Sequence, residues 1–197
     1  MYVNMIQTAW VVGLCNMGEA GHISSLLLCI AGLVLTAIIS YLLGSLNFGI
    51  LISKYKYHQD IRQFGSGNAG MTNMLRTYGK GAALATLLGD ALKTAVSILV
   101  VGHFLSGFTG AYVAGLACIV GHVFPVYYNF KGGKGVVAAA MMILCVNPLV
   151  FAILFPVFIL IVLFTRYISV GSILCMMMYP LVEYKVSGAG FHVLVSI

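Results

Sequence analysis

Two glycine-rich segments of this chain combine the residue types that bind phosphate. The first, residues 62–80, reads RQFGSGNAGMTNMLRTYGK. Glycines in such a loop can expose backbone N–H groups to an anion, and an arginine guanidinium matches the shape of a phosphate. A solvated, turn-rich connector is the plainer interpretation. The density of donors favours an anion site instead, to which we assign Ser66, Gly67, Asn68, Thr72, Asn73 and Arg76.

The second segment, KGGKG at residues 131–135, lies directly before an apolar run. Glycines and a lysine at a helix N-terminus can hold phosphate through backbone dipoles and one point charge. The alternative is a basic membrane flank that needs flexibility. The pattern GxxxxGK[ST] cannot be fitted here, so this is not a Walker A loop. The phosphate site predicted here consists of Lys131, Gly132, Gly133, Lys134 and Gly135.

Residues 65–70 also match GxGxxG, and Asp90 lies twenty residues after Gly70. This is the outward form of a dinucleotide-binding fingerprint, which requires a preceding β-strand. An apolar run and a charged linker precede the motif instead, and Asp90 lies inside another apolar run. The sequence context therefore excludes a Rossmann site.

Three ionisable residues lie in or beside apolar runs. His122 is a candidate general base, although a hydrogen-bonded structural histidine is the default interpretation. Asp90 and Lys93 are three residues apart and share one helix face. We expect them to neutralise each other, and a role in shaping a substrate cavity stays open. The five cysteines contain no CxxC pair, so we predict neither a disulfide framework nor a zinc site.

The elements that carry these residues must be membrane helices. Of 197 residues, 61% are hydrophobic and only 7% are charged, and the mean hydropathy is +1.07. Soluble domains carry about 25% charged residues. This composition excludes a soluble enzyme and a nucleic-acid partner, and predicts an all-α polytopic transmembrane bundle of about six spans. The expected spans are 23–44 (extending past a break at Gly44–Ser45), 81–101, 108–124, 135–146, 150–164 and 168–182.

The distribution of cations predicts the orientation. Eight of the ten Lys and Arg residues lie in three loops that alternate spans place on one side. The positive-inside rule assigns these glycine-rich loops to the cytoplasm and the N-terminus to the outside. Residues 1–22 lack the basic start of a signal peptide. Either they form an N-terminal extension, which we favour, or translation begins at Met17. Residues 23–197 are predicted to form a single integral-membrane domain.

Four segments in order carry a resemblance: YLLGSLNFG, GSGNAGMTNMLRTYGKGAA, GHVFPVYYNFKGGKG and RYISVGSI. Together they resemble the PlsY family of bacterial membrane acyltransferases over about two-thirds of the chain. The resemblance implies transfer of a fatty acyl group from acyl phosphate to the sn-1 hydroxyl of glycerol 3-phosphate, which forms lysophosphatidic acid. It also implies the bacterial plasma membrane, contact with membrane lipid, no cofactor, and a functional link to the enzyme that forms acyl phosphate.

By the same resemblance, Ser66, Arg76 and Lys134 hold phosphate. No histidine of this chain has Asp five residues later, so the His-x4-Asp acyltransferase class does not fit. That leaves His122 or the substrate phosphate as proton acceptor, and we favour the phosphate. Asn47 stands where the family usually has Pro. Family members also carry a seventh span and a stretch with functional His and Asn, so we expect this chain to be C-terminally shortened.

A transporter or channel for a phosphorylated small molecule is the alternative. Basic glycine-rich loops and an intramembrane Asp–Lys pair would suit that function. The internal repeat that many transporters carry is not visible in this sequence. We therefore favour the acyltransferase.

Overall fold

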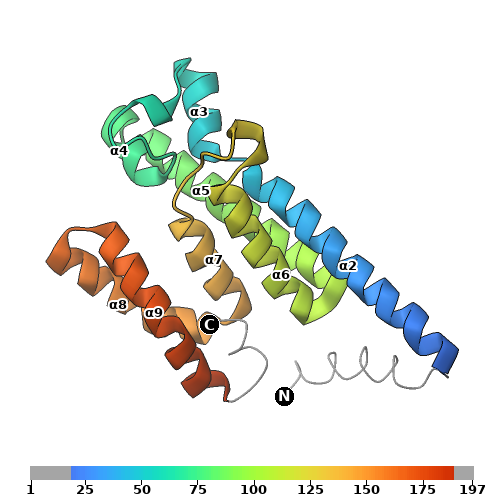
Figure 1. Ribbon diagram of the computed structural model, residues 1–197. Coiled ribbons are helices and arrows are strands. Elements are labelled where there is room, and N and C mark those ends of the chain that lie inside the picture. The colour runs from blue at the N-terminus through green and yellow to red at the C-terminus, as the bar shows by residue number, and fades with distance from the viewer. Residues whose placement is uncertain (1–18, 189–197) are drawn as a thin grey trace. The chain divides into compact units, whose positions relative to one another are not determined.

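The computed structural model describes the backbone of residues 19–188 and the side chains of 26–107 and 109–188. Every regular element in these ranges is helical (Figure 1). The elements are α2 (Glu19–Ser45), α3 (Phe48–Tyr57), η1 (Ile61–Gln63), α4 (Met71–Tyr78), α5 (Lys80–Val96), η2 (Ser97–Gly102), α6 (His103–Val123), η3 (Val126–Tyr128), α7 (Val136–Val146), α8 (Pro148–Thr165) and α9 (Ile168–Ser187). The interpretation of residues 1–22 as an extension falls almost entirely outside the described residues.

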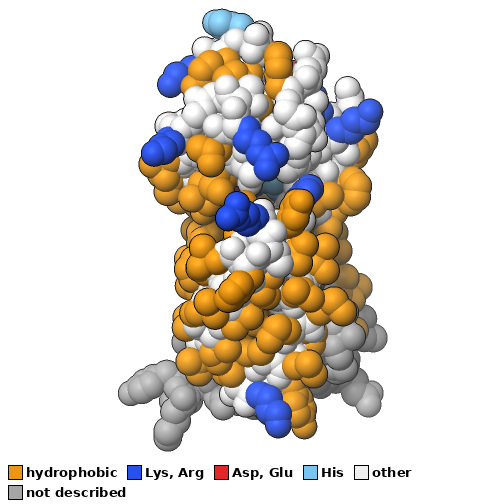
Figure 2. Space-filling model, turned by 90° about the vertical axis from the view of Figure 1, so that its left-hand side faces the viewer, with side chains coloured by type: hydrophobic (Ala, Val, Ile, Leu, Met, Phe, Trp, Pro, Cys, Tyr) orange, Lys and Arg blue, Asp and Glu red, His pale blue; other side chains and the backbone are white. Residues whose placement is uncertain are grey.

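Four helical stretches of the described part are long and apolar enough to cross a membrane: Leu26–Tyr57, Lys80–Gly107, Thr109–Tyr128 and Pro148–Thr165. Hydrophobic side chains cover much of the surface in Figure 2, as lipid contact requires. The predicted all-helical membrane fold is confirmed. Helix α7, at 11 residues, is shorter than a full span, and the number of six spans stays a prediction.

The helices form two compact units, one ending at Ala138 and the other beginning at Ala139. The predicted single domain over residues 23–197 stays a prediction. All residues proposed to bind phosphate lie in the first unit.

In the first unit, α2 and α6 run side by side (Figure 1) and touch through their backbones. A Cβ atom added to Gly121 would collide with the backbone of Tyr41 and Ser45 on α2. Small residues allow this close approach, which is a common basis of helix packing in membranes. The contact fixes the end of α6, which carries His122, against the end of α2.

The expected break at Gly44–Ser45 is confirmed, since α2 ends at Ser45 and α3 begins at Phe48. Asn47 is fully buried, and its Oδ1 accepts a hydrogen bond from the Ile50 N–H at 3.2 Å. This is an N-cap, which satisfies one of the unpaired donors at the start of α3. Asparagine therefore starts the second helix at the position where the resemblance would place proline.

The second unit contains a helical hairpin of α8 and α9. Asn147, between the expected spans 135–146 and 150–164, caps α8, and its Nδ2 donates to Glu183 Oε1 at 3.0 Å. Ser187 Oγ donates to the same oxygen at 2.8 Å. These polar contacts join the start of α8 to the last turns of α9.

Candidate functional site

The first glycine-rich loop is shaped from within by Asn73, a residue that is only 1% exposed. Its Oδ1 accepts from the Ser66 N–H at 3.0 Å. Its Nδ2 donates to the carbonyls of Phe64 at 2.9 Å and Ile61 at 3.2 Å. Because all of these partners belong to the protein, the Asn73 amide holds the loop in shape. Gly65 packs so closely on this amide that a Cβ would collide with Asn73 Oδ1.

The backbone N–H groups of this loop are used differently from what we expected. Those of Ser66 and Gly67 are already donated, to Asn73 Oδ1 and to the Phe64 carbonyl, each at 3.0 Å. These two amides are therefore not available to a ligand, whereas several side chains of the segment point outward. Ser66 and Arg76 are exposed, and Asn68 and Thr72 are half-buried. Among the described residues, the Arg76 guanidinium has no ion-pair partner, so it is available to bind an anion.

The second loop caps the C-terminal end of α6. The Gly132 N–H donates to the Val123 carbonyl, and the Gly133 N–H donates to the His122 carbonyl, both at 3.1 Å. Unpaired carbonyls at a helix end need such donors. The loop then turns at Gly135, which has a φ of 74°, into α7. Lys131 and Lys134 are exposed on this loop.

The His122 side chain lies directly beneath the second loop. A Cβ atom on Gly133 would collide with His122 Nε2. Only glycine lets the backbone approach the imidazole this closely. His122 is only 4% exposed, so its imidazole is almost closed to solvent.

On its other side, His122 contacts the buried ion pair. Lys93 Nζ lies 2.8 Å from Asp90 Oδ1 and 3.0 Å from His122 Nδ1. Asp90 and Lys93 are 2% and 5% exposed. The predicted pairing of Asp90 with Lys93 is thus present, and packing adds His122, which is 29 residues away in sequence.

The Lys93 ammonium also binds the break between α2 and α3. It donates to the carbonyls of Gly44 at 3.0 Å and Leu46 at 2.8 Å. Asp90 Oδ1 in turn accepts a long bond from the Phe48 N–H at 3.4 Å. One buried pair therefore joins the helix break, α5 and the end of α6.

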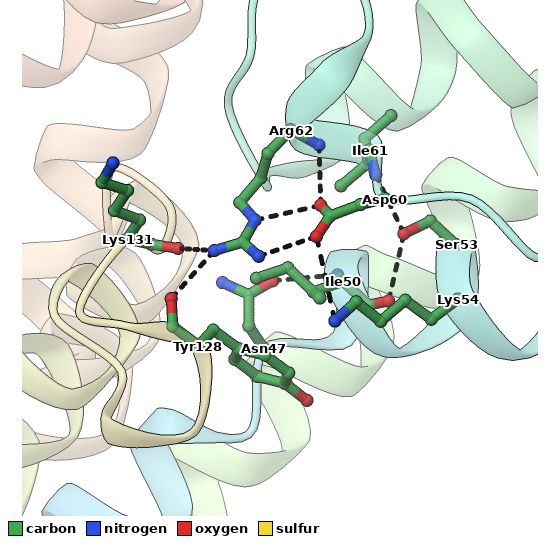
Figure 3. Close-up of polar contacts among 9 residues, drawn as sticks. All are labelled: Asn47, Ile50, Ser53, Lys54, Asp60, Ile61, Arg62, Tyr128 and Lys131. Atoms are coloured by element: carbon green, nitrogen blue, oxygen red, sulfur yellow. Dashed lines mark hydrogen bonds and ion pairs between the residues drawn. The ribbon is translucent and has the colours of Figure 1, made fainter.

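Arg62 connects the two glycine-rich loops (Figure 3). It donates to both carboxylate oxygens of Asp60, at 2.9 and 2.7 Å, and to the carbonyls of Tyr128 and Lys131, both at 2.9 Å. The hydrogen bond from Arg62 lowers the pKa of Asp60. Sequence reasoning counted Arg62 only as a cytoplasmic cation. The sequence signal that could have identified Arg62 is Asp60, an acidic residue two positions earlier.

The structure also separates some features from the predicted site. A shallow hollow is lined by Lys54, His58, Gln59, Asp60, Gln63 and Phe64. None of these is a predicted phosphate-binding residue. Within the described side chains, no group of three His, Cys, Asp or Glu residues is placed to hold a metal ion.

Known sequences that are similar to this chain carry one and the same description. A family model described as glycerol-3-phosphate acyltransferase matches residues 34–197. A glycerol-3-phosphate acyltransferase of Finegoldia magna is 44% identical over 142 residues, which are 72% of this chain and 71% of that relative. One from Thermoanaerobacter sp. (strain X514) is 43% identical over 140 residues, or 71% of this chain and 70% of the relative.

Similar solved structures have the same description as these sequence relatives. The chain is similar to the crystal structure of PlsY (YgiH), an integral membrane glycerol 3-phosphate acyltransferase, in its glycerol 3-phosphate form. The TM-score is 0.75 at 33% identity, over 83% of this chain and 82% of that one. The lysophosphatidic acid form of PlsY gives a TM-score of 0.72 at 31% identity over the same shares. The chain is therefore a multi-pass membrane protein that belongs to the glycerol-3-phosphate acyltransferase family.

Proposed function

We propose that this protein transfers a fatty acyl group from acyl phosphate to the sn-1 hydroxyl of glycerol 3-phosphate and releases lysophosphatidic acid. The observation that carries the proposal is the junction of the two basic glycine-rich loops through Arg62. Arg76 lies on α4, the helix that follows the first loop, and Lys134 lies in the second loop. The similar PlsY structures, named for their glycerol 3-phosphate and lysophosphatidic acid forms, support the same substrate and product.

Both proposed substrates are anions, and each needs its charge held near the other. In this proposal the exposed side chains of Ser66, Arg76, Lys131 and Lys134 supply the positive charge and the donors. Asn68 and Thr72 add half-buried donors, while Gly67, Asn73, Gly132, Gly133 and Gly135 shape the loops. Charge stabilisation and proximity account for most of such catalysis, because acyl phosphate is already an activated mixed anhydride.

The reaction forms one ester bond and breaks one anhydride bond. The glycerol hydroxyl oxygen attacks the acyl carbonyl carbon, and the bond from that carbon to the phosphate oxygen breaks. The hydroxyl proton must reach an acceptor as the ester forms. In the proposed mechanism it passes to a phosphate oxygen, so that hydrogen phosphate leaves and no protein base is required.

The surroundings of His122 support this assignment. Its Nδ1 lies 3.0 Å from Lys93 Nζ and 3.5 Å from Asp90 Oδ1, so this nitrogen faces the buried ion pair. Its Nε2 faces Gly133. Both ring nitrogens therefore contact the protein, and the side chain is almost fully buried. We therefore propose that His122 supports the phosphate loop and does not act as the general base.

We further propose that these loops face the cytoplasm of a bacterial plasma membrane, with the N-terminus outside. The support is the bias of cations toward three loops. A cytoplasmic site would also have direct access to soluble glycerol 3-phosphate and to the enzyme that forms acyl phosphate.

The test of the activity is an assay with purified protein, palmitoyl phosphate and labelled glycerol 3-phosphate, without CoA or metal. We expect labelled lysophosphatidic acid from the wild type. Arg76→Gln should lower kcat/KM about 10- to 100-fold, the value of a lost charged hydrogen bond. Lys56→Gln is the matched control, because Lys56 is exposed on α3 and lies outside the predicted site. Vesicle uptake of glycerol 3-phosphate without acylation would support a transporter instead.

The role of His122 is tested in the same assay. With a substrate base, His122→Ala should reduce kcat by about tenfold, well short of the 10³-fold or more expected if the base itself were removed. His122→Asn should recover part of the loss, since its side-chain oxygen can accept from Lys93. A thousandfold loss of kcat in His122→Ala with KM unchanged would show that His122 is the base.

A further inference from the structure

Arg62 has almost no capacity left for a ligand. A guanidinium carries five N–H donors. Asp60 takes two of them, and the carbonyls of Tyr128 and Lys131 take two more. The guanidinium also lies 6.0 Å from the centre of the Tyr128 ring. Arg62 thus differs from the exposed Arg76, and its binding partners are parts of the protein.

The two carbonyls that Arg62 binds flank a strained turn. Between Tyr128 and Lys131 lie Asn129 and Phe130, whose φ angles are 55° and 57°. Left-handed backbone is uncommon outside glycine, and for a bulky residue such as Phe it is an outlier. Such a conformation persists only where its surroundings impose it. Arg62 holds both ends of this turn, directly before the KGGKG loop.

Arg62 is itself held firmly in the first loop. Asp60 caps η1 by accepting from the Arg62 N–H at 3.0 Å, so backbone and side chain of Arg62 bind the same carboxylate. Ile61, which lies between Asp60 and Arg62, donates its N–H to the buried Ser53 Oγ at 3.2 Å. Figure 3 shows these contacts passing from α3 through Asp60 and Arg62 to the second loop. A bidentate arginine–carboxylate pair adds geometric precision to such a link.

We propose that Arg62 is a positioning residue that sets the spacing of the two phosphate-binding loops and thereby the rate of acyl transfer. It imposes the strained turn on the second loop from an anchor on the first. The kinetic part of this inference rests on the function proposed above. The structural part, the spacing of the loops, is independent of any activity.

The expected kinetic effect falls on kcat. Each loop keeps its own phosphate-binding side chains in an Arg62 variant, so KM for either substrate should change less than threefold. A misplacement of about 1 Å between reacting groups can cost about 100-fold in rate, and we expect a loss of that size in Arg62→Gln. Arg62→Lys should lose about tenfold, because a point charge can bind one carbonyl but cannot bridge all partners.

Lys54→Met is the matched control. Lys54 lies in the same neighbourhood, 3.8 Å from Asp60 Oδ2 and 5.5 Å from the Tyr128 ring centre. It makes neither carbonyl contact with the second loop. Its loss removes one cation beside Asp60 without releasing the turn, so kcat should stay within twofold of wild type.

A rescue experiment separates positioning from simple loss of charge. Phe130 is 58% exposed, so replacing its side chain removes little packing. Glycine adopts a φ of 57° without strain. Phe130→Gly alone should therefore leave kcat nearly unchanged. Added to Arg62→Gln, it should raise kcat at least threefold above that of Arg62→Gln. A direct role of Arg62 in phosphate binding would give no such rescue.

The loop spacing is measured without substrate. Spin labels at the exposed residues Gln63 and Tyr127, in a cysteine-free background, report the distance between the loops by pulsed electron resonance. We expect a narrow distribution in wild type and Lys54→Met, a broad one in Arg62→Gln, and narrowing when Phe130→Gly is added.

An unchanged distribution in Arg62→Gln would overturn the inference. So would a raised KM for glycerol 3-phosphate at unchanged kcat, which would make Arg62 a substrate ligand. If the wild type forms no lysophosphatidic acid, the proposed function fails, and the distance measurement still decides whether Arg62 sets the spacing.

Discussion

The first unit contains two acid–base pairs of nearly equal length in very different surroundings. Arg62 and Asp60 are 2.7 Å apart at the loop end, with side chains 21% and 15% exposed. Lys93 and Asp90 are 2.8 Å apart among the helices, and each side chain is 3% exposed. Distance alone would rank the pairs as equivalent. Burial makes them differ in what happens when one partner is removed.

We call Arg62–Asp60 the outer pair and Lys93–Asp90 the inner pair. If one residue is removed, water can solvate the remaining charge only in the outer pair. When one charge of a buried pair is removed, the other is left in apolar surroundings, and this is strongly destabilising. The Arg62–Asp60 pair is partly exposed, so water can solvate the charge that remains and the pair should contribute less to folding. The Lys93–Asp90 pair should thus contribute more to folding stability, while the proposed role of the Arg62–Asp60 pair is to position the two loops.

Breaking the inner pair should have the largest effect. Lys93→Met leaves Asp90 buried without its cation, and we expect a loss of about 3–5 kcal/mol in unfolding free energy. The helix break also loses its bonds to the Gly44 and Leu46 carbonyls. The measurement is unfolding of the purified protein in detergent micelles. Adding Asp90→Asn should recover part of the loss, because the unpaired charge is gone.

The double variant sharpens the comparison. Coupling between Asp90 and Lys93 in a double-mutant cycle should exceed about 1 kcal/mol, within the range for residues in contact. A Lys93→Met variant as stable as wild type would show that burial does not distinguish the two pairs.

Weakening the outer pair should have a smaller, pH-dependent effect. Asp60→Asn keeps the η1 cap but removes the charge that Arg62 binds, and we expect a loss of about 1 kcal/mol at pH 7. Because the folded state lowers the pKa of Asp60, its stabilisation is complete above the ordinary aspartate value, about 3.9, and is lost as the pH falls through the lower folded-state pKa. Unfolding curves at pH 7 and pH 3 test this. A difference between variant and wild type that does not shrink at pH 3 would contradict it.

Removing an exposed cation should have the smallest effect. Lys54 is 49% exposed and lies 3.8 Å from Asp60. Lys54→Met should change the unfolding free energy by less than about 0.5 kcal/mol, as is usual for surface pairs. The same unfolding assay measures it, with Lys93→Met as the matched removal of a buried cation. A loss as large as that of Lys93→Met would mean that exposure does not decide the outcome.

The sequence was sufficient to predict the helical framework. The predicted runs 81–101 and 135–146 correspond to α5 with η2 and to α7, within one residue at each end. Hydrophobic runs and helix-stop signals depend only on residues close together in the chain, so a single sequence is enough to predict them. The break at Gly44–Ser45 and the interruption between the runs 135–146 and 150–164 were found for the same reason. The Asp90–Lys93 pair was also visible, because i and i+3 face one side of a helix.

The remaining contacts depend on packing between distant segments. Nothing near His122 in sequence indicates that its Nδ1 meets Lys93. Nor could the sequence show that the backbone amides of Gly67 and Gly133 would bond within the protein, to Phe64 and His122. Glycine-rich composition predicts available donors, but only the fold determines which of them a ligand can reach.

The position of Lys93 also has a consequence for biogenesis. The carbonyls at the end of a helix lack helical partners. Lys93 bonds the carbonyl of Gly44, in the last turn of α2, and that of Leu46, just after α2, and it follows them by 49 and 47 residues. The first hydrophobic segment therefore leaves the ribosome before the group that completes it. Within lipid, such open carbonyls are costly. The end of α2 therefore gains these two hydrogen bonds only after α5 has been synthesised and has packed against it.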